Sequence, residues 1–149
     1  MTRVRYSPSM DGADHINIHL SANTRLGRLL SEGARTPFTH PKHGQFASYG
    51  AFRVWCRSGK KHECLKILWG KDITGKGCKY PEVPLETYRD ELIVAMNLKI
   101  DNCAELKQLI LENELPLVCY FVFNNTLRRP NYGDVVITAV SEYKKNHGR

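Results

Sequence analysis

The amino-acid sequence predicts a compact α+β domain that is dominated by helices and contains a small β-sheet. Two stretches, residues 86–99 and 102–110, repeat apolar residues every three or four positions, which is the spacing of one face of an α-helix. Two others, residues 16–20 and 117–123, alternate apolar and polar residues or concentrate β-branched and aromatic ones, as β-strands do. Because the 149 residues contain no internal repeat and no linker, we expect one domain over residues 1–149.

Residues 1–44 are predicted to be mostly irregular, with two short elements. Residues 1–14 have no periodicity and are expected to form a loose N-terminal arm. A half-buried strand follows over residues 16–20, and a short helical turn over residues 23–30. Residues 36–44 contain two prolines and a closing glycine, which predicts a loop.

Helices are predicted for most of the remaining chain. The first helix is capped by Ser48, and the second covers residues 61–71 and ends before the Thr74-Gly75-Lys76-Gly77 loop. A third helix is expected over residues 86–99, and a fourth has a capping-box-like start at Asn102 and Glu105. A buried strand over residues 117–123 and turns over residues 124–133 follow. Residues 135–143 fit either a strand or a helix.

The formal net charge of +7 is concentrated in one part of the chain. Residues 53–79 contain eight basic and two acidic residues, whereas residues 82–114 contain three basic and eight acidic residues. Trp55, Trp69 and Tyr80 lie in or beside the basic stretch, and this combination is typical of surfaces that contact phosphates and stack on bases. A solvated helical face followed by a lysine-rich loop has the same composition, so both interpretations stay open.

Several kinds of site are disfavoured by the residues present. Five cysteines at irregular spacing predict reduced thiols. The absence of an apolar signal-peptide core and of a bilayer-length apolar run predicts a cytoplasmic protein. Four neighbouring residues could bind zinc, namely Cys56, His62, Cys64 and Cys78. A zinc site is not expected, because only His62 and Cys64 lie close together in the sequence. The glycine-containing loop at residues 74–77 lacks the spacing of a phosphate-binding loop.

The sequence resembles the NADAR (YbiA-like) family from about Ile16 to Phe123. The resemblance rests on Ile16-Asn17-Ile18-His19, Gly27-Arg28-Leu29-Leu30-Ser31-Glu32-Gly33-Ala34, Pro37-Phe38, Gly44-Gln45-Phe46-Ala47-Ser48, the helical residues 88–100 with their Lys99-Ile100 pair, residues 104–111 and Leu117-Val118. It implies a compact, helix-rich α+β fold. It also implies cleavage of N-glycosidic bonds to ribose derivatives, including removal of ADP-ribose from nucleic-acid bases in toxin–antitoxin systems and in phages that counter such toxins.

The sequence departs from the family pattern where the chemistry is expected. Such hydrolysis passes through an oxocarbenium-like state that a carboxylate normally stabilises, yet the glutamate of the family's Ser-x-Glu-His motif falls at Gly50. The late Asp-x-x-Trp-Gly motif has no counterpart, and Asn131-Tyr132-Gly133-Asp134 is the only echo of the closing Asn-x-Leu-Gly motif. Two hypotheses follow. Either Glu32 or Asp134 replaces the lost charge and the chain is a hydrolase, or the site is inactive and binds nucleotide or ADP-ribosylated nucleic acid.

We favour the first hypothesis, in which the chain removes ADP-ribose from nucleobases in DNA. Water is then the co-substrate, and no metal or cofactor is required. The roles that follow from the resemblance and the charge pattern are Glu32, or else Asp134, as the catalytic carboxylate; Arg28, Arg35, Lys99, Trp55 and Asn131 as substrate contacts; and Arg53, Arg57, Lys60 and Lys61 as contacts to nucleic-acid phosphates. For Trp55, packing in the core on its helix is the favoured alternative to stacking on a base.

The expected partner is ADP-ribosylated DNA, with RNA as an alternative. No membrane is expected to take part, and the default oligomeric state is a monomer. A weaker alternative is hydrolysis of a small riboflavin-pathway glycosylamine, which the basic composition disfavours. His19, His40 and His43 flank the candidate site, but a lone histidine is more often a surface or core residue than an acid–base group.

Overall fold

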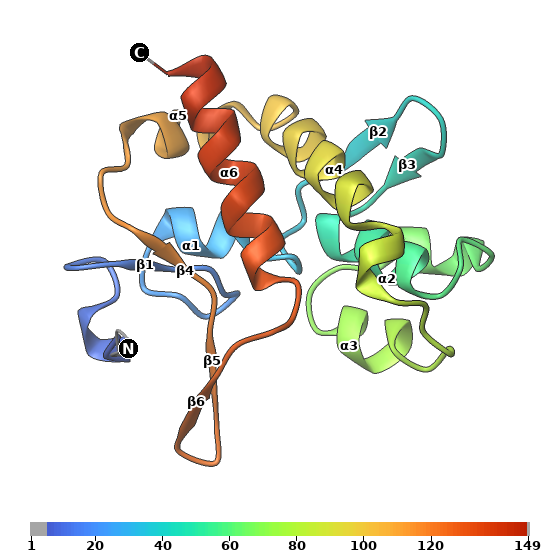
Figure 1. Ribbon diagram of the computed structural model, residues 1–149, viewed down its shortest axis with the longest axis horizontal. Helices are drawn as coiled ribbons and strands as arrows, with labels where there is room; N and C mark the ends of the chain where they lie inside the picture. The colour runs from blue at the N-terminus through green and yellow to red at the C-terminus, as the bar shows by residue number, and fades with distance from the viewer. Residues whose placement is uncertain (1–5, 149) are drawn as a thin grey trace.

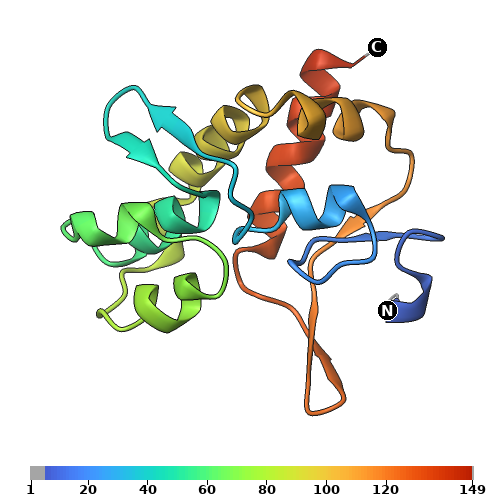
Figure 2. The ribbon, with the colours of Figure 1, turned by 180° about the vertical axis from the view of Figure 1, so that it is seen from behind.

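Two helices, α4 (Arg89–Asp101) and α6 (Gly133–His147), pack against each other in the middle of the fold (Figure 1, Figure 2). The computed structural model describes residues 6–148, and over these residues it contains six α-helices and three two-stranded sheets. The other α-helices are α1 (Arg25–Leu30), α2 (Tyr49–Arg57), α3 (Asp72–Gly77) and α5 (Ala104–Glu112), and short 3-10 turns cover Pro8–Met10, Glu63–Ile67 and Leu85–Thr87. The predicted helix-dominated α+β class is confirmed.

Helix α2 is buried on all sides, because α3, α4 and the 3-10 turn at Glu63–Ile67 surround it. Ser48 caps it as predicted: the hydroxyl accepts a hydrogen bond from the Ala51 N–H (3.0 Å) and donates one to the Leu68 carbonyl oxygen (2.8 Å). Every residue from Tyr49 to Cys56 is buried. The sequence predicts one apolar face, but tertiary packing buries the opposite face as well, and Arg53 is carried into the interior with it.

Three short strand pairs complete the fold. Strand β1 (Ile16–Asn17) runs parallel to β4 (Leu117–Val118), and this pairing joins segments from opposite ends of the sequence. The other two pairs are antiparallel hairpins, β2 (Phe38–His40) with β3 (Gly44–Phe46) and β5 (Phe121–Phe123) with β6 (Thr126–Arg128).

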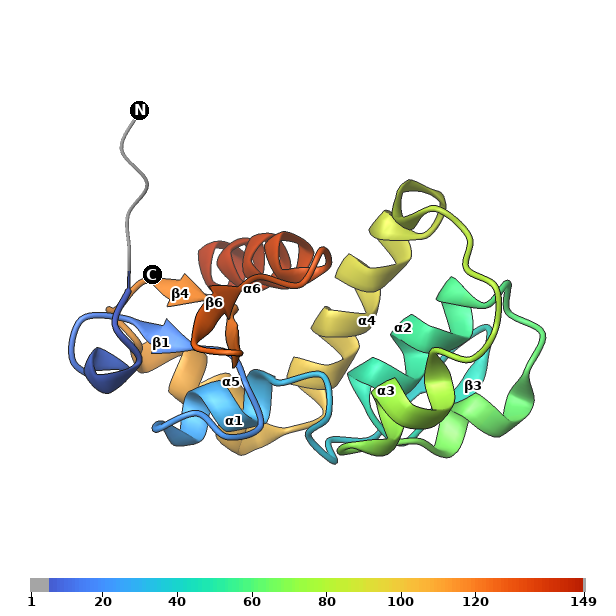
Figure 3. The same ribbon diagram turned by 90° about the horizontal axis from the view of Figure 1, so that it is seen from below.

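The β5–β6 hairpin turns at Asn124 and Asn125, whose φ angles of 50° and 60° suit a two-residue type I′ turn. The hairpin projects away from the helices in Figure 1 and points toward the viewer in Figure 3. Because of this position, Phe121 and Val122 of the hairpin line the cleft described below.

Tertiary packing overrides several local patterns. Most of residues 36–44 belong to the β2–β3 hairpin rather than to a loop. Phe38 and Phe46 are paired across the two strands, their rings stack, and both are buried in the core. The predicted helix over residues 61–71 shortens to a 3-10 turn. Helix α3 includes the Thr74-Gly75-Lys76-Gly77 sequence that was expected to be a loop, and its buried Ile73 anchors it.

The C-terminal part differs from the prediction in two places. Residues 126–128 form strand β6, although turns were expected over residues 124–133. The expected buried strand over residues 117–123 is interrupted: β4 lies against β1, whereas every residue of β5 is exposed. Residues 135–143, which fit either a strand or a helix, are helical in α6.

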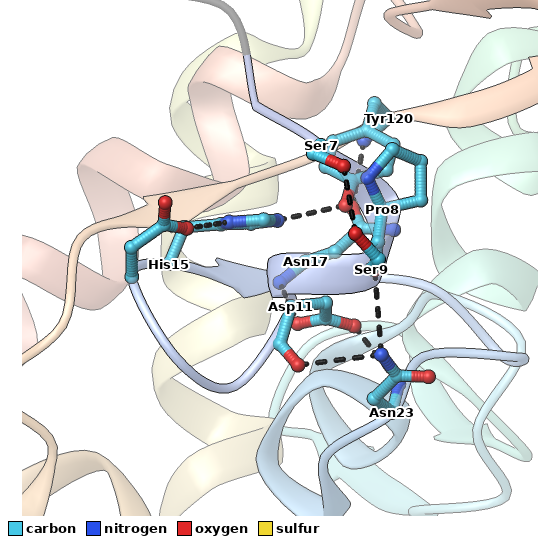
Figure 4. Close-up of polar contacts among 9 residues, drawn as sticks. Ser7, Pro8, Ser9, Asp11, His15, Asn17, Asn23 and Tyr120 are labelled. Atoms are coloured by element: carbon cyan, nitrogen blue, oxygen red, sulfur yellow. Dashed lines mark hydrogen bonds and ion pairs between the residues drawn. The ribbon is translucent and has the colours of Figure 1, made fainter.

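Residues 6–14 are held against the body of the molecule, chiefly by Asp11. The two oxygens of its buried carboxylate accept hydrogen bonds from the N–H groups of Asn17 (2.8 Å) and Asn23 (2.9 Å), and the Asn23 amide donates to the Asp11 carbonyl oxygen at 3.3 Å (Figure 4). The expected loose arm is therefore wrong for residues 6–14, because long-range hydrogen bonds supply order that periodicity does not reveal. Residues 1–5 lie outside the described residues.

The apolar side chains form one hydrophobic core, to which each of the six α-helices contributes. Its densest part is an aromatic group in which the Phe46 ring lies 4.9 Å from the Phe52 ring and 5.3 Å from the Trp55 ring, measured between centroids. In the part of the chain that the structure describes, none of the helices combines the length and the apolar composition that a membrane crossing requires.

Candidate functional site

A cleft of about 490 Å³ lies beside α2 and the start of α6. This volume is within the range of pockets that bind small molecules. Its lining comes from residues 18–21, residues 30–33, Arg53 on α2, the chain between residues 70 and 74, residues 119–122, and the chain between residues 130 and 136. Parts of the segments 18–21 and 30–33 belong to the stretches that carry the NADAR resemblance, so the cleft is the candidate site.

A buried ion pair between Glu32 and Arg53 lies in the cleft. The Arg53 Nε donates to Glu32 Oε2 at 2.5 Å and the Arg53 Nη2 to Glu32 Oε1 at 3.0 Å, which makes the pair bidentate. Only 12% of the Glu32 side chain and 7% of the Arg53 side chain are exposed. The Tyr132 ring covers the guanidinium, with the ring centre 4.2 Å from Arg53 Cζ. Glu32 and Tyr132 therefore hold the guanidinium from two sides.

The charges in this group shift the pKa of their neighbours. Burial lowers the pKa of Arg53, but attraction and hydrogen bonding from Glu32 outweigh burial, so the pKa lies above its ordinary value. Burial, with the nearby charge of Glu32, raises the pKa of Tyr132 and of Tyr49. The ordinary tyrosine pKa of 10 already keeps both phenols protonated at neutral pH, and these upward shifts act in the same direction.

Position 50 shows why Glu32 reaches the cleft. The Gly50 N–H donates to the Glu32 carbonyl oxygen at 2.8 Å. A Cβ atom at residue 50 would lie 2.7 Å from that same oxygen and would collide with the Ile73 side chain. The space that a glutamate would need here is therefore filled by the main chain of Glu32, whose own side chain enters the cleft.

Lys99 lies directly behind this segment. It is fully buried, and its Nζ donates to the Ser31 carbonyl oxygen at 2.9 Å, which fixes the residue before Glu32. Burial lowers the pKa of Lys99 to about 7, although the negative charge of Glu32 opposes that shift. Lys99 is not part of the cleft lining, so the structure makes it a positioning residue rather than a substrate contact.

His19 and Cys119 also line the cleft. The His19 Nδ1 accepts a hydrogen bond from the Ser21 N–H (3.0 Å), and burial lowers the pKa of His19, so a neutral ring carries its proton on Nε2. Burial, and then the charges of Glu32 and Asp134, raises the pKa of Cys119 to about 12. A protonated thiol is a poor nucleophile, so Cys119 is not suited to covalent chemistry, whereas the His19 Nε2–H can donate a hydrogen bond to a ligand.

Tyr120 forms another part of the wall and is held from outside the cleft. Its hydroxyl lies 2.7 Å from Nε2 of the buried His15, whose Nδ1 lies 2.6 Å from Asp14 Oδ1 (Figure 4). Its N–H donates to Asn17 Oδ1 at 2.9 Å. The N-terminal segment thus fixes the chain that enters the β5–β6 hairpin.

Among the residues predicted to act on the substrate, only Glu32 lines the cleft. Asp134 and Asn131 are exposed outside its lining. The Arg28 Nη1 donates to the carbonyl oxygens of Ala22 (2.9 Å) and Asn23 (3.1 Å) instead. Arg35 is exposed and stacks over Trp69, with 5.3 Å between Cζ and the ring centre.

Trp55 was named as a substrate contact, with packing in the core as the favoured alternative; only 4% of it is exposed and its ring packs against Phe46 in the core. An aromatic residue on a helix surrounded by other elements is a core residue, whichever charged residues flank it in sequence. The structure therefore corrects this assignment.

The expected phosphate contacts on and after α2 are also largely corrected. Arg53 is buried against Glu32, Arg57 pairs with Glu82 at 3.1 Å, and Lys60 pairs with Glu91 at 2.6 Å. Lys61 alone of the four is exposed without an ion pair among the described residues. Of the acidic stretch 82–114, Glu82 and Glu91 thus pair with residues of the basic stretch 53–79, and Glu32 compensates the charge of Arg53.

Several residues that line the cleft were not predicted from the sequence to lie together. Tyr132 lies one residue after the chosen Asn131, and Arg53 lies three residues after Gly50, but no local pattern shows that both meet Glu32. Lys71, Phe121 and Val122 line the cleft through loops and the hairpin, where periodicity carries no information.

Comparisons with protein-family models, with curated protein sequences and with solved structures gave no match. Over residues 6–148 no group of three or more His, Cys, Asp or Glu side chains is arranged to hold a metal ion.

The ion pair predicts a large loss of stability when one partner is removed. Glu32→Ala leaves the Arg53 guanidinium buried without its counter-charge, and the free energy of unfolding should fall by roughly 3–5 kcal/mol in urea denaturation. Arg25→Ala is the matched control, because it breaks an exposed ion pair with Glu105, and it should leave stability nearly unchanged. Equal effects of the two substitutions would contradict a buried pair.

Lys99 predicts a pH-dependent stability. The pKa of about 7 in the folded chain lies below the ordinary 10.5, so between these values the unfolded chain binds more protons and stability rises with pH. The free energy of unfolding of the unmodified chain, relative to that of Lys99→Met, should rise between pH 7 and 9 by at most about 1.4 kcal/mol per pH unit. Parallel stability curves for the two proteins would show that Lys99 keeps an ordinary pKa.

Proposed function

We propose that the chain hydrolyses the N-glycosidic bond between ADP-ribose and a nucleobase of DNA, with the ribose bound in the cleft. The observation that carries the proposal is the Glu32 carboxylate, which lines the cleft although the position of the family's glutamate is a glycine. The arrangement of the NADAR-like segments adds support. Gly50 contacts Glu32 directly, and Lys99 holds the Ser31 carbonyl oxygen beside it.

The polar groups of the cleft suit a charged ribose derivative. Its lining combines the Glu32–Arg53 pair with the neutral His19 ring and the ammonium group of the exposed Lys71. An ammonium group is a good partner for a pyrophosphate, and an imidazole N–H can donate to a ribose hydroxyl. Apolar side chains that include Ile18, Leu20, Leu30, Phe121 and Val122 also line the cleft and favour a flat ring.

The proposed reaction needs one well-placed carboxylate. As the bond between the ribose C1 and the base nitrogen breaks, its electron pair goes to the nitrogen and positive charge develops on C1 and the ring oxygen. Glu32 stabilises that charge, and Arg53 and the main chain at Gly50 hold it in place. Water adds its oxygen to C1, and one water proton passes through the carboxylate to the nitrogen of the departing base.

A second candidate function is binding without turnover. It is favoured by one specific observation: both oxygens of Glu32 accept hydrogen bonds from Arg53, which compensates the negative charge. In that case the cleft recognises ADP-ribose or a nucleotide, and the protein shields or sequesters modified DNA. The hydrolase is the better-supported proposal, because a buried, oriented carboxylate in a ligand-sized cleft is the group that the reaction requires.

Glu32→Gln should reduce the release of ADP-ribose from ADP-ribosylated DNA oligonucleotides by about 10²- to 10³-fold, because it removes the charge that faces the transition state. Asp134→Asn, the matched control outside the cleft, should leave the rate unchanged. Product release is measured by chromatography on oligonucleotides bearing modified guanine or modified thymine. If the unmodified chain binds these oligonucleotides but releases nothing at stoichiometric concentration, the binding function replaces the hydrolase.

A further inference from the structure

The β5–β6 hairpin exposes apolar side chains at the border of the cleft. The exposed fractions are 37% for Phe121, 56% for Val122, 53% for Phe123 and 36% for Leu127. A two-stranded hairpin that projects from the molecule buries few side chains of its own. A group of exposed apolar residues on it therefore indicates a binding surface. Because Phe121 and Val122 also line the cleft, a partner on the hairpin is continuous with the site.

The two faces of the hairpin differ in chemistry. Alternation along β5 places Phe121 and Phe123 on one face, and the strand register sets Arg128 opposite Phe121. The Arg128 guanidinium lies 5.2 Å from the centre of the Phe123 ring. This aromatic face therefore carries two rings and a cation, whereas Val122 and Leu127 form a pair on the other face.

The charge around the hairpin is positive. Residues 115–133 contain Arg128 and Arg129 and no acidic residue. Among the residues that the structure describes, neither arginine forms an ion pair, and the same holds for Lys71 in the cleft. These cations are therefore available to a polyanion, as is Lys61 after α2, whereas Arg53, Arg57 and Lys60 are paired.

We propose that the aromatic face of the β5–β6 hairpin is the docking surface for single-stranded DNA. Unpaired bases stack on Phe121 and Phe123 while Arg128 and Arg129 contact phosphates, and the strand leads its modified base into the cleft. Paired bases present no free face to such rings, and a base that enters a cleft must leave its stack, so a single-stranded segment fits and an intact duplex does not. The proposal rests on the proposed function in naming DNA and extends it by assigning the surface that holds the strand.

Binding of a fluorescein-labelled, unmodified single-stranded DNA oligonucleotide tests the proposal by fluorescence anisotropy. The double variant Phe121→Ala/Phe123→Ala should raise Kd roughly tenfold or more with an unchanged salt dependence. Arg128→Gln/Arg129→Gln should also weaken binding and should reduce the slope of log K against log salt by about 1.4, because each phosphate contact to a single strand contributes about 0.7. Ile67→Ala/Val94→Ala is the matched control, because both side chains are exposed and apolar but lie outside the cleft lining, and it should bind like the unmodified chain.

Each outcome decides between the two proposals. No binding of single-stranded DNA by the unmodified chain, or equal binding by the aromatic and control variants, overturns the docking surface; so does binding of RNA alone. DNA binding that depends on the hairpin, without release of ADP-ribose from the modified oligonucleotide, supports the docking surface and overturns the hydrolase. Urea denaturation of each variant shows that binding losses are not losses of folding, since the substituted side chains are exposed.

Discussion

The contact between the main chain of Glu32 and Gly50 is the constraint on which the cleft depends. A side chain at residue 50 would overlap the Glu32 carbonyl oxygen, so the two segments approach closely only because residue 50 is glycine. That approach places the Glu32 carboxylate beside Arg53, one turn along α2, and Tyr132 closes the group from the start of α6. The Lys99 ammonium group donates a hydrogen bond to the Ser31 carbonyl oxygen and so holds the same segment from the side of the core. The site is therefore built around a main-chain contact, and its charged side chains follow from that contact.

The same packing redistributes the charge of the molecule. A basic stretch would be expected to attract nucleic acid, but Glu82 and Glu91 compensate Arg57 and Lys60, and Glu32 compensates Arg53. Exposed ion pairs contribute little to stability, so the main effect of these contacts is on where positive charge remains. Among the described residues, positive charge without an ion pair remains in Lys71 beside the cleft and in Arg128 and Arg129 at the hairpin, and also in Lys61 and Lys79 of the basic stretch.

The predictions that succeeded rest on local rules. Ser48 has the geometry of a helix cap wherever a helix follows it, and the regular apolar spacing of α4 leaves one assignment for that segment. The resemblance placed Glu32 in the turn that normally carries an asparagine; its side chain lines the cleft, and its catalytic role stays a prediction. The failures rest on long-range contacts. The burial of Arg53, the order of residues 6–14 and the pairing of residues 36–44 all depend on partners elsewhere in the chain, which one sequence does not reveal.

The position of bound ADP-ribose tests the central claim most directly. A crystal structure of the chain with ADP-ribose should place the ligand in the cleft, with the ribose C1 about 3–3.5 Å from a Glu32 carboxylate oxygen, the distance at which the reacting groups of a productive complex lie. ADP-ribose bound elsewhere, or bound in the cleft with its ribose turned away from Glu32, would contradict the account.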